Sequence, residues 1–300
     1  MKETKDLNST FVVNCILNAF LSFTATALNI ITLQALRKTS PVLKPLKTLL
    51  LSMTFSDLGV GLLVQPLYIT VLAQCADYKV VTSHTCKSAL NNIWNTSFFI
   101  AVNLFSTASF LSIIALTLDR FLAIHLHLRY QELVTHKRVI IAVILIWVYS
   151  ALVCVSLLIT EKVRVIIYTI LELLFVITTS LLYCKIYATI RRHRNQIQVQ
   201  QGIQAEQNGE LTDRARHRKT AVGTFYVYIL FLICYVPFFC IHVASVVYIE
   251  STVLSDLLCY AMTLIFLNSS LNPVIYCWKI RHIRQAVFDI ARNIIPSRFY

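Results

Sequence analysis

Two acidic residues interrupt long apolar stretches of this sequence: Asp57 lies near the middle of one and Glu172 near the middle of another. If these stretches cross a membrane, a carboxylate there costs about 2.5–3.5 kcal/mol to insert and needs a cation or a proton beside it. Uncharged polar residues lie at comparable depth in the apolar stretches: Asn29, Ser109, Asn268, Ser269 and Asn272. Asp57 therefore indicates an ion site or a proton relay. Hydrogen bonds that only join helices, worth about 0.6 kcal/mol each, are the alternative for the uncharged residues. Glu172 either projects into a binding pocket or hydrogen-bonds neighbouring helices.

The composition restricts the class of protein. Of the 300 residues, 57% are hydrophobic and 14% are charged, against about 25% charged in an average soluble domain. The mean hydropathy is +0.68. These values exclude a disordered chain and disfavour a soluble enzyme. The net charge of +13 does not indicate a nucleic-acid partner, because the basic residues form short clusters between apolar runs, as they do in membrane proteins.

Seven stretches are long and apolar enough to span a bilayer, since a hydrocarbon core about 30 Å thick requires a helix of about 20 residues. The predicted spans are 11–36, 46–74, 91–124, 138–160, 165–190, 219–249 and 253–277. Glu161, Lys162 and Arg164 leave room only for a very tight turn between the fourth and fifth spans. The fold class is therefore an all-α membrane protein, a seven-transmembrane helix bundle.

Lysine and arginine are distributed unequally between the two ends of these spans, with 21 residues at one end and six at the other. Loops rich in Lys and Arg stay in the cytoplasm, so the richer end is predicted to be inside. This orientation gives an extracellular N-terminus at 1–10, a transmembrane domain at 11–277 and a cytoplasmic segment at 278–300.

Two segments of the inner side have their own patterns. The polar stretch 193–217 is expected to be a flexible loop. In 279–291 the apolar residues Ile280, Ile283, Val287 and Ile290 recur at helical spacing. This pattern predicts a short amphipathic helix that lies on the inner leaflet of the lipid bilayer.

Short motifs recur in order along the spans, and together they resemble those of the rhodopsin-like (class A) G-protein-coupled receptors. The matching residues are Asn29, Ser56-Asp57-Leu58, Asp119-Arg120-Phe121, Trp147, Tyr183, Cys234-Tyr235-Val236-Pro237 and Asn272-Pro273-Val274-Ile275-Tyr276. Two of these motifs are altered, because Phe121 replaces the usual tyrosine and Tyr235 the usual tryptophan. The resemblance extends over essentially the whole chain.

The resemblance implies a role for each matching residue. It implies a sodium pocket formed by Asp57, Ser109, Asn268, Ser269 and Asn272, with sodium as an allosteric ligand and no other cofactor. It implies an activation switch formed by Asp119, Arg120, Tyr183, Phe231, Tyr235, Pro237, Pro273 and Tyr276. Arg120 is expected to pair with Asp119 in the inactive state. In the active state Arg120 and Leu128 are expected to contact a heterotrimeric G protein.

The resemblance also implies an extracellular ligand and a pocket for it. The candidate lining residues are Val102, Asn103, Ser106, Glu172, Phe238, Phe239, His242, Met262 and Phe266. Val102 occupies the position of the amine-binding aspartate and Phe266 that of the retinal lysine, which disfavours aminergic receptors and opsins. His242 stands where adenosine receptors have asparagine. A small molecule, a lipid and a peptide all remain candidate ligands.

The segment after the last span, with Ile280-Arg281 and Arg284-Gln285, resembles that of the adenosine receptors. Three departures from the family pattern, one of them the very short second outer loop, resemble the melanocortin and lysolipid/cannabinoid branch, and the chain is placed near this combined cluster. Asn95 stands where most relatives have the cysteine of an outer disulfide, and Phe175 stands where most have proline. Cys75 and Cys86, near the first outer loop, are candidates for a different disulfide, with Cys259 as a third candidate partner.

The sequence thus predicts a plasma-membrane receptor without enzymatic activity. Asn8 opens the sequon Asn8-Ser9-Thr10, a glycosylation site on the extracellular side. Two alternatives remain: a transporter or channel that uses Asp57 as an ion relay, and a homologue of the receptors that does not signal.

Overall fold

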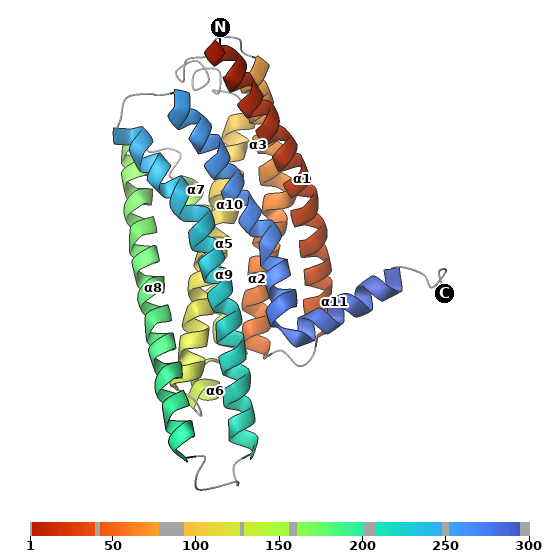
Figure 1. Cartoon of the computed structure of the whole chain (residues 1–300), viewed down its shortest axis with the longest axis vertical. Coiled ribbons are helices and arrows are strands. Elements are labelled where there is room, and N and C mark those ends of the chain that lie inside the picture. The colour runs from red at the N-terminus through yellow and green to blue at the C-terminus, as the bar shows by residue number, and fades with distance from the viewer. Residues whose placement is uncertain are drawn as a thin grey trace.

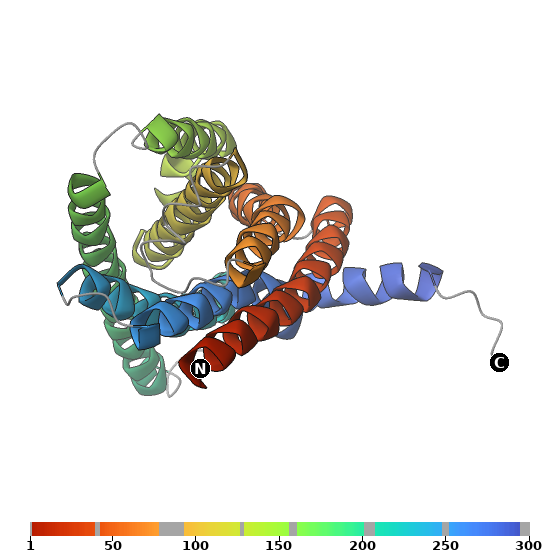
Figure 2. The ribbon, with the colours of Figure 1, turned by 90° about the horizontal axis from the view of Figure 1, so that it is seen from above.

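The computed structural model describes residues 2–39, 43–77, 93–126, 129–155, 161–200, 208–247 and 252–294. These segments fold into long helices that run side by side (Figure 1). Seen from above, the helices are grouped into a bundle (Figure 2). The elements are α1 (Lys2–Lys38), α2 (Lys44–Gly59), the π-helix η1 (Val60–Val64), α3 (Gln65–Asp77), α5 (Ile93–His125), α6 (Tyr130–Leu133), α7 (His136–Cys154), α8 (Glu161–Gln200), α9 (Asn208–Val247), α10 (Thr252–Lys279) and α11 (Arg281–Ile294).

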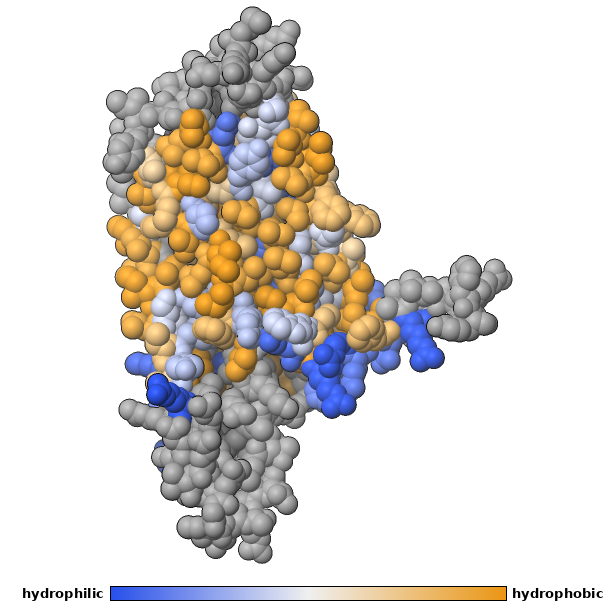
Figure 3. Space-filling model, in the orientation of Figure 1, coloured by the Kyte–Doolittle hydropathy of each residue, from blue (hydrophilic) through white to orange (hydrophobic). Residues whose placement is uncertain are grey.

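Seven helical segments among the described residues are long and apolar enough to cross a membrane, which confirms the predicted number of spans. They are Ser9–Lys38, Lys44–Gln74, Ile93–His125, His136–Cys154, Thr169–Thr189, Val222–Ala244 and Asp256–Lys279. Figure 3 shows the apolar band that these segments form on one face of the bundle, with hydrophilic residues gathered below it. Large apolar side chains of the spans, such as Phe23 and Leu181, are more than half exposed, as expected of a surface that contacts lipid.

Helices occupy residues of two segments that were expected to be loops. The turn expected at Glu161–Arg164 is wrong, because α8 already begins at Glu161, where an acidic residue favours the start of a helix. The stretch 193–217, expected to be a loop, continues α8 to Gln200 and begins α9 at Asn208. Long polar side chains such as glutamine and arginine have good helix propensity and no proline interrupts them, so these helices extend beyond the spans.

The second span contains a wider turn that the sequence did not predict. The π-helix Val60–Val64 joins α2 to α3, and Pro66 follows it. In a regular α-helix the ring of Pro66 would clash with the carbonyl group of Leu62, and Pro66 has no amide hydrogen to donate. The wider turn accommodates both constraints within one continuous span.

The second, third and fourth spans are joined around Trp147 of α7. Its indole Nε1 donates to Ser52 Oγ at 3.2 Å, and Ser52 Oγ lies 3.2 Å from Ser112 Oγ of α5. The rings of Phe55 and Phe105 meet the indole edge-on, with centroids 5.4 and 6.1 Å away. One aromatic side chain thus links three spans by both packing and hydrogen bonding.

The C-terminal helix α11 turns away from the bundle axis at the foot of α10 and packs against α1 (Figure 1). Ile283 and Ile290 are buried on one face, and Arg281 and Arg284 are exposed on the other. The predicted amphipathic pattern is therefore present. The helix begins at Arg281 and extends to Ile294, three residues farther than expected.

Gly59 allows α2 and α5 to approach closely, because a Cβ atom at this position would overlap the ring of Phe105. We predict that Gly59→Ala destabilises the folded protein by about 1–3 kcal/mol, a cost typical of overpacking, and lowers its thermal unfolding temperature in detergent. Gly223→Ala is the matched control, since its Cβ atom would lie 3.2 Å from Lys279 Cβ, which is a tight contact but not an overlap. Equal unfolding temperatures for the two variants would contradict the close packing of α2 on α5.

Candidate functional site

Asp57 lies fully buried on α2, in the middle of the bundle. Its Oδ2 accepts a hydrogen bond from Asn272 Nδ2 of α10 at 2.9 Å, and the Ser269 side chain lies within hydrogen-bonding reach of the carboxylate. The second carboxylate oxygen, Oδ1, has no hydrogen-bond partner among the described residues. A buried carboxylate with so few donors favours the binding of a cation or a proton.

Other oxygen atoms near the same depth are also unpartnered among the described residues. They are Ser109 Oγ, Asn268 Oδ1 and Asn272 Oδ1, and all three side chains are buried. One carboxylate with hydroxyl and amide oxygens is a donor set that suits a hard cation such as sodium. Within the described residues no group of three or more His, Cys, Asp or Glu could hold a metal ion, so a site of the transition-metal type is not present there. The residues predicted for a sodium pocket fit that ion chemically.

A second polar centre lies at the basic end of α5. Asp119 Oδ2 accepts from Arg120 Nε at 2.9 Å and also contacts Arg120 Nη2. Asp119 Oδ1 accepts from the hydroxyl group of Tyr130 at 2.7 Å. Arg120 is 1% exposed, so its charge is neutralised inside the protein by the neighbouring carboxylate.

Tyr130 of α6 takes part in this polar centre, and the sequence analysis did not indicate it. Burial raises the pKa of its hydroxyl group, and the negative charge of Asp119 raises it further. The hydroxyl group therefore stays protonated and remains a donor to Asp119. Tyr130 lies 11 residues after Asp119, beyond the end of the helix, so no helical spacing relates the two.

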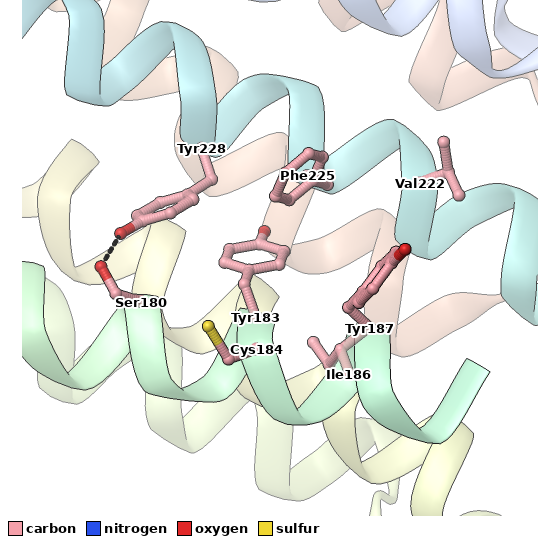
Figure 4. A pocket seen from close by; sticks show the side chains of 8 residues that line it. All are labelled: Ser180, Tyr183, Cys184, Ile186, Tyr187, Val222, Phe225 and Tyr228. Carbon is pink, nitrogen blue, oxygen red and sulfur yellow. Dashed lines mark hydrogen bonds between the residues drawn. The ribbon is translucent and has the colours of Figure 1, made fainter. Parts of the chain in front are cut away.

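Two of the three tyrosines predicted for the switch, Tyr183 and Tyr276, form hydrogen bonds with residues other than Arg120 in this structure. Tyr183 donates to the carbonyl oxygen of Thr224 at 2.9 Å, and its hydroxyl oxygen accepts from Thr117 at 3.3 Å. Tyr276 donates to the sulfur atom of Met53 at 2.9 Å. Tyr183 also stacks on the Tyr228 ring with centroids 4.6 Å apart (Figure 4).

An aromatic cluster connects the third, fifth and sixth spans in the middle of the bundle. Phe231 stacks on Tyr235 with centroids 4.0 Å apart and meets Phe110 and Phe175 edge-on at 5.5 and 5.4 Å. The ring centroids of Phe110 and Phe175 are 3.5 Å apart. Phe231 and Tyr235 were predicted as switch residues, whereas Phe110 was not. Phe175 was noted only because it replaces the usual proline.

The predicted ligand-pocket residues come from four spans, and Glu172 is the one on α8. Val102, Asn103 and Ser106 lie on α5, Phe238, Phe239 and His242 on α9, and Met262 and Phe266 on α10. The His242 ring stacks on Phe238 with centroids 5.4 Å apart. Asn103 Nδ2 donates to the carbonyl oxygen of Phe99 in its own helix at 2.7 Å. Phe266 is fully buried against Tyr68, whose ring was not predicted to take part.

Several predicted site residues lie outside the part of the chain that the structure describes. Leu128 and Cys86 are outside it entirely, and the side chains of Asn8, Cys75 and Glu172 are outside it as well. The predicted glycosylation, the Cys75–Cys86 disulfide, the G-protein contact of Leu128 and the two alternatives for Glu172 therefore stay predictions.

Polar residues of the first span form a cluster that the sequence analysis missed. Asn18 Nδ2 donates to Thr263 Oγ1 of α10 at 2.8 Å, and Thr263 Oγ1 donates to Asn14 Oδ1 at 2.8 Å. Asn14, Asn18 and Thr263 are all buried. Two asparagines four residues apart in an apolar stretch were the available signal, because that spacing places both on one face of a helix.

The chain matches the sequence model of the family described as "7 transmembrane receptor (rhodopsin family)" over residues 28–165 and 160–276. It is 23% identical to the adenosine receptor A3 of Ovis aries over 275 residues, which cover 83% of this chain and 81% of that protein. It is 24% identical to the alpha-1A adrenergic receptor of Bos taurus over 270 residues, which cover 74% of this chain and 57% of that protein. It is 24% identical to the melanocortin receptor 3 of Mus musculus over 211 residues, which cover 67% of this chain and 61% of that protein.

The oxygen-rich centre at Asp57 generates a test with purified protein. We predict that replacing potassium with sodium at constant ionic strength raises the thermal unfolding temperature. Sodium at ten times its Kd stabilises the folded state by about 1.4 kcal/mol. Asp57→Asn should abolish the sodium-dependent increase, because it removes the negative charge. The control is Ser112→Ala, which removes a buried hydroxyl group that already bonds Ser52. A sodium effect that survives in Asp57→Asn would contradict the ion site.

Proposed function

The chain belongs to the rhodopsin family of seven-transmembrane receptors, and from this premise we propose how its bundle carries a signal. It is a multi-pass membrane protein and a class A G-protein-coupled receptor, not an enzyme. The family implies an extracellular ligand and a heterotrimeric G protein as partners, and the plasma membrane is its usual location. This family membership argues against the alternative of a transporter or channel.

The proposed topology follows from charge. Residues 1–10 are extracellular, 11–277 form the transmembrane domain and 278–300 are cytoplasmic, with α11 on the inner leaflet. The excess of lysine and arginine at the end of the bundle that carries Arg120 supports this orientation.

We propose that the Asp119–Arg120–Tyr130 arrangement holds the receptor in an inactive state, and its geometry is the observation that carries the proposed function. Both carboxylate oxygens of Asp119 are occupied, one by Arg120 and the other by Tyr130. Arg120 is thereby kept away from a cytoplasmic partner. Activation opens the bundle at the inner ends of α8 and α9 and exposes Arg120 to the G protein, with Leu128 as a further contact. In that step the switch tyrosines Tyr183 and Tyr276 leave the hydrogen-bond partners that they have in this structure and turn toward Arg120.

We propose that the ligand binds at the opposite end, between α5, α9 and α10. The lining residues there are mostly apolar with a few polar groups, which is typical of small-molecule sites. The candidates for polar recognition are Asn103, Ser106 and His242, and the Asn103 amide also donates to its own helix. Sodium at Asp57 acts as an allosteric ligand that favours the inactive packing.

Basal G-protein activation tests the proposed switch before a ligand is known. We predict that Asp119→Asn raises basal activation across a panel of Gα subunits, because the loss of charge releases Arg120. Tyr130→Phe should raise it less, since it removes one of the two restraints on Asp119. Arg120→Ala should lower it below wild type.

The comparison requires matched surface expression and a control for charge removal at the same end of the bundle. Arg37→Ala serves this purpose, because Arg37 is an exposed basic residue of α1. A decrease on Asp119→Asn, or equal values for all variants with a signal above background, would contradict the switch. No signal from any variant would favour the homologue that does not signal.

The extracellular N-terminus has a test of its own. We predict that Asn8→Gln increases gel mobility to the same extent as enzymatic removal of N-linked sugars from the wild-type receptor, because Asn8 is the acceptor of the sequon. Thr10→Ala, which removes the sequon but keeps Asn8, should migrate with Asn8→Gln. An unshifted band for both variants would show that the sequon is unused and would weaken the proposed orientation.

A further inference from the structure

A cavity of about 340 Å³ lies between α8 and α9 in the half of the bundle that carries the basic residues. Its walls are Tyr183, Cys184 and Tyr187 of α8 and Val222, Phe225 and Tyr228 of α9 (Figure 4). We call these six residues and the space between them the α8–α9 groove. Its volume is at the lower end of the range of about 300–1,000 Å³ found for ligand pockets.

The groove opens toward the lipid. Its residues belong to the ends of the spans Thr169–Thr189 and Val222–Ala244, so hydrocarbon is the medium beside it. Tyr187 is 68% exposed, Val222 and Phe225 are each 41% exposed, and Cys184 is exposed as well. The lining is almost entirely apolar, and the one hydrogen bond drawn there joins Ser180 to Tyr228 at 2.6 Å. An apolar chain is therefore a suitable occupant.

Positive charge lies at the membrane-surface end of the groove. Cys184, Tyr187 and Arg191 follow one another at spacings of three and four residues, which places Arg191 below the groove on the same face of α8. Arg191 is exposed and lies two residues beyond the end of the span, at the depth of lipid headgroups. Lys185 is also exposed on α8, and its long side chain can reach the same surface.

We propose that the α8–α9 groove binds one anionic glycerophospholipid of the inner leaflet, with an acyl chain in the groove and the headgroup phosphate beside Arg191 and Lys185. The apolar lining matches the chain, and the basic side chains match the phosphate. A neutral phospholipid supplies the same chain without the net negative charge, so it binds more weakly.

The site touches the switch. Tyr183 forms one wall of the groove, and its hydroxyl group bonds Thr117 and Thr224 on the neighbouring helices. A chain seated between α8 and α9 packs against Tyr183 and Tyr228 and fixes the spacing of the two helices at whose inner ends the bundle opens on activation. The lipid composition of the inner leaflet thereby influences the activation of the receptor.

The test uses the full-length receptor in nanodiscs of phosphatidylcholine. A phosphatidylglycerol with a photoactivatable diazirine in its acyl chain is added, and labelled residues are mapped by mass spectrometry. We expect labelling to concentrate on 180–187 and 222–228. Val222→Trp, which fills the groove, should reduce this labelling about tenfold, whereas Ile233→Trp, on a lipid-facing part of α9 outside the groove, should not. Cys184→Trp fills the groove from the opposite wall and replaces Val222→Trp if that variant does not fold.

The headgroup is tested with a charge variant and a second lipid. Arg191→Gln should reduce labelling by the phosphatidylglycerol probe about fivefold, which corresponds to about 1 kcal/mol. Arg281→Gln, which removes an exposed charge on α11, is the control. A phosphatidylcholine probe of the same chain should label the groove weakly and should not respond to Arg191→Gln. Uniform labelling that the tryptophan variants do not reduce, or equal labelling by both probes, would overturn the proposal. The readout needs no G protein, so it is independent of the proposed signalling.

Discussion

The hydrocarbon of the bilayer offers no hydrogen-bond partner, and this constraint determines most of the structure. Backbone amides in the hydrocarbon must be satisfied within their own helix, so each of the seven spans is helical. Polar side chains must in turn find partners on neighbouring helices. Because lipid is as apolar as a leucine side chain, apolar burial alone does not select which helices meet. The selection falls to a few polar contacts, such as Asn18 with Thr263, Ser52 with Trp147 and Asp57 with Asn272.

The two buried carboxylates are satisfied to different degrees, and this difference separates their roles. Asp119 has a partner on each oxygen, and one of them carries a full positive charge. Asp57 is held by neutral side chains and keeps one oxygen unpartnered among the described residues. Removing one member of a buried ion pair costs about 3–5 kcal/mol, so a partner that draws Arg120 away from Asp119 must supply comparable free energy. At Asp57 a small cation can bind without breaking any ion pair.

The number of spans and the basic end followed from the sequence, because bilayer thickness and charge distribution act on the chain residue by residue. Individual site residues such as Asp57 and Arg120 followed from motif resemblance, not from periodicity. The contacts that sequence reasoning missed depend on two segments at once. Tyr130 reaches Asp119 from beyond the end of α5, and Gly59 matters only because Phe105 lies against it. The π-helix before Pro66 depends on the backbone hydrogen bonds within one span, and hydropathy carries no information about these bonds.

The distribution of prolines distinguishes α9 from α8. Phe175 stands where most relatives have proline, so the described part of α8 contains no proline to remove a backbone hydrogen bond, and the Phe175 ring fills the space beside Phe110. Pro237, in contrast, interrupts the hydrogen bonding of α9 one turn above the aromatic contact between Phe231 and Tyr235. A packed aromatic cluster resists continuous deformation and changes between discrete arrangements. Of these two helices, α9 is therefore the one that can bend at its proline without losing a further backbone hydrogen bond.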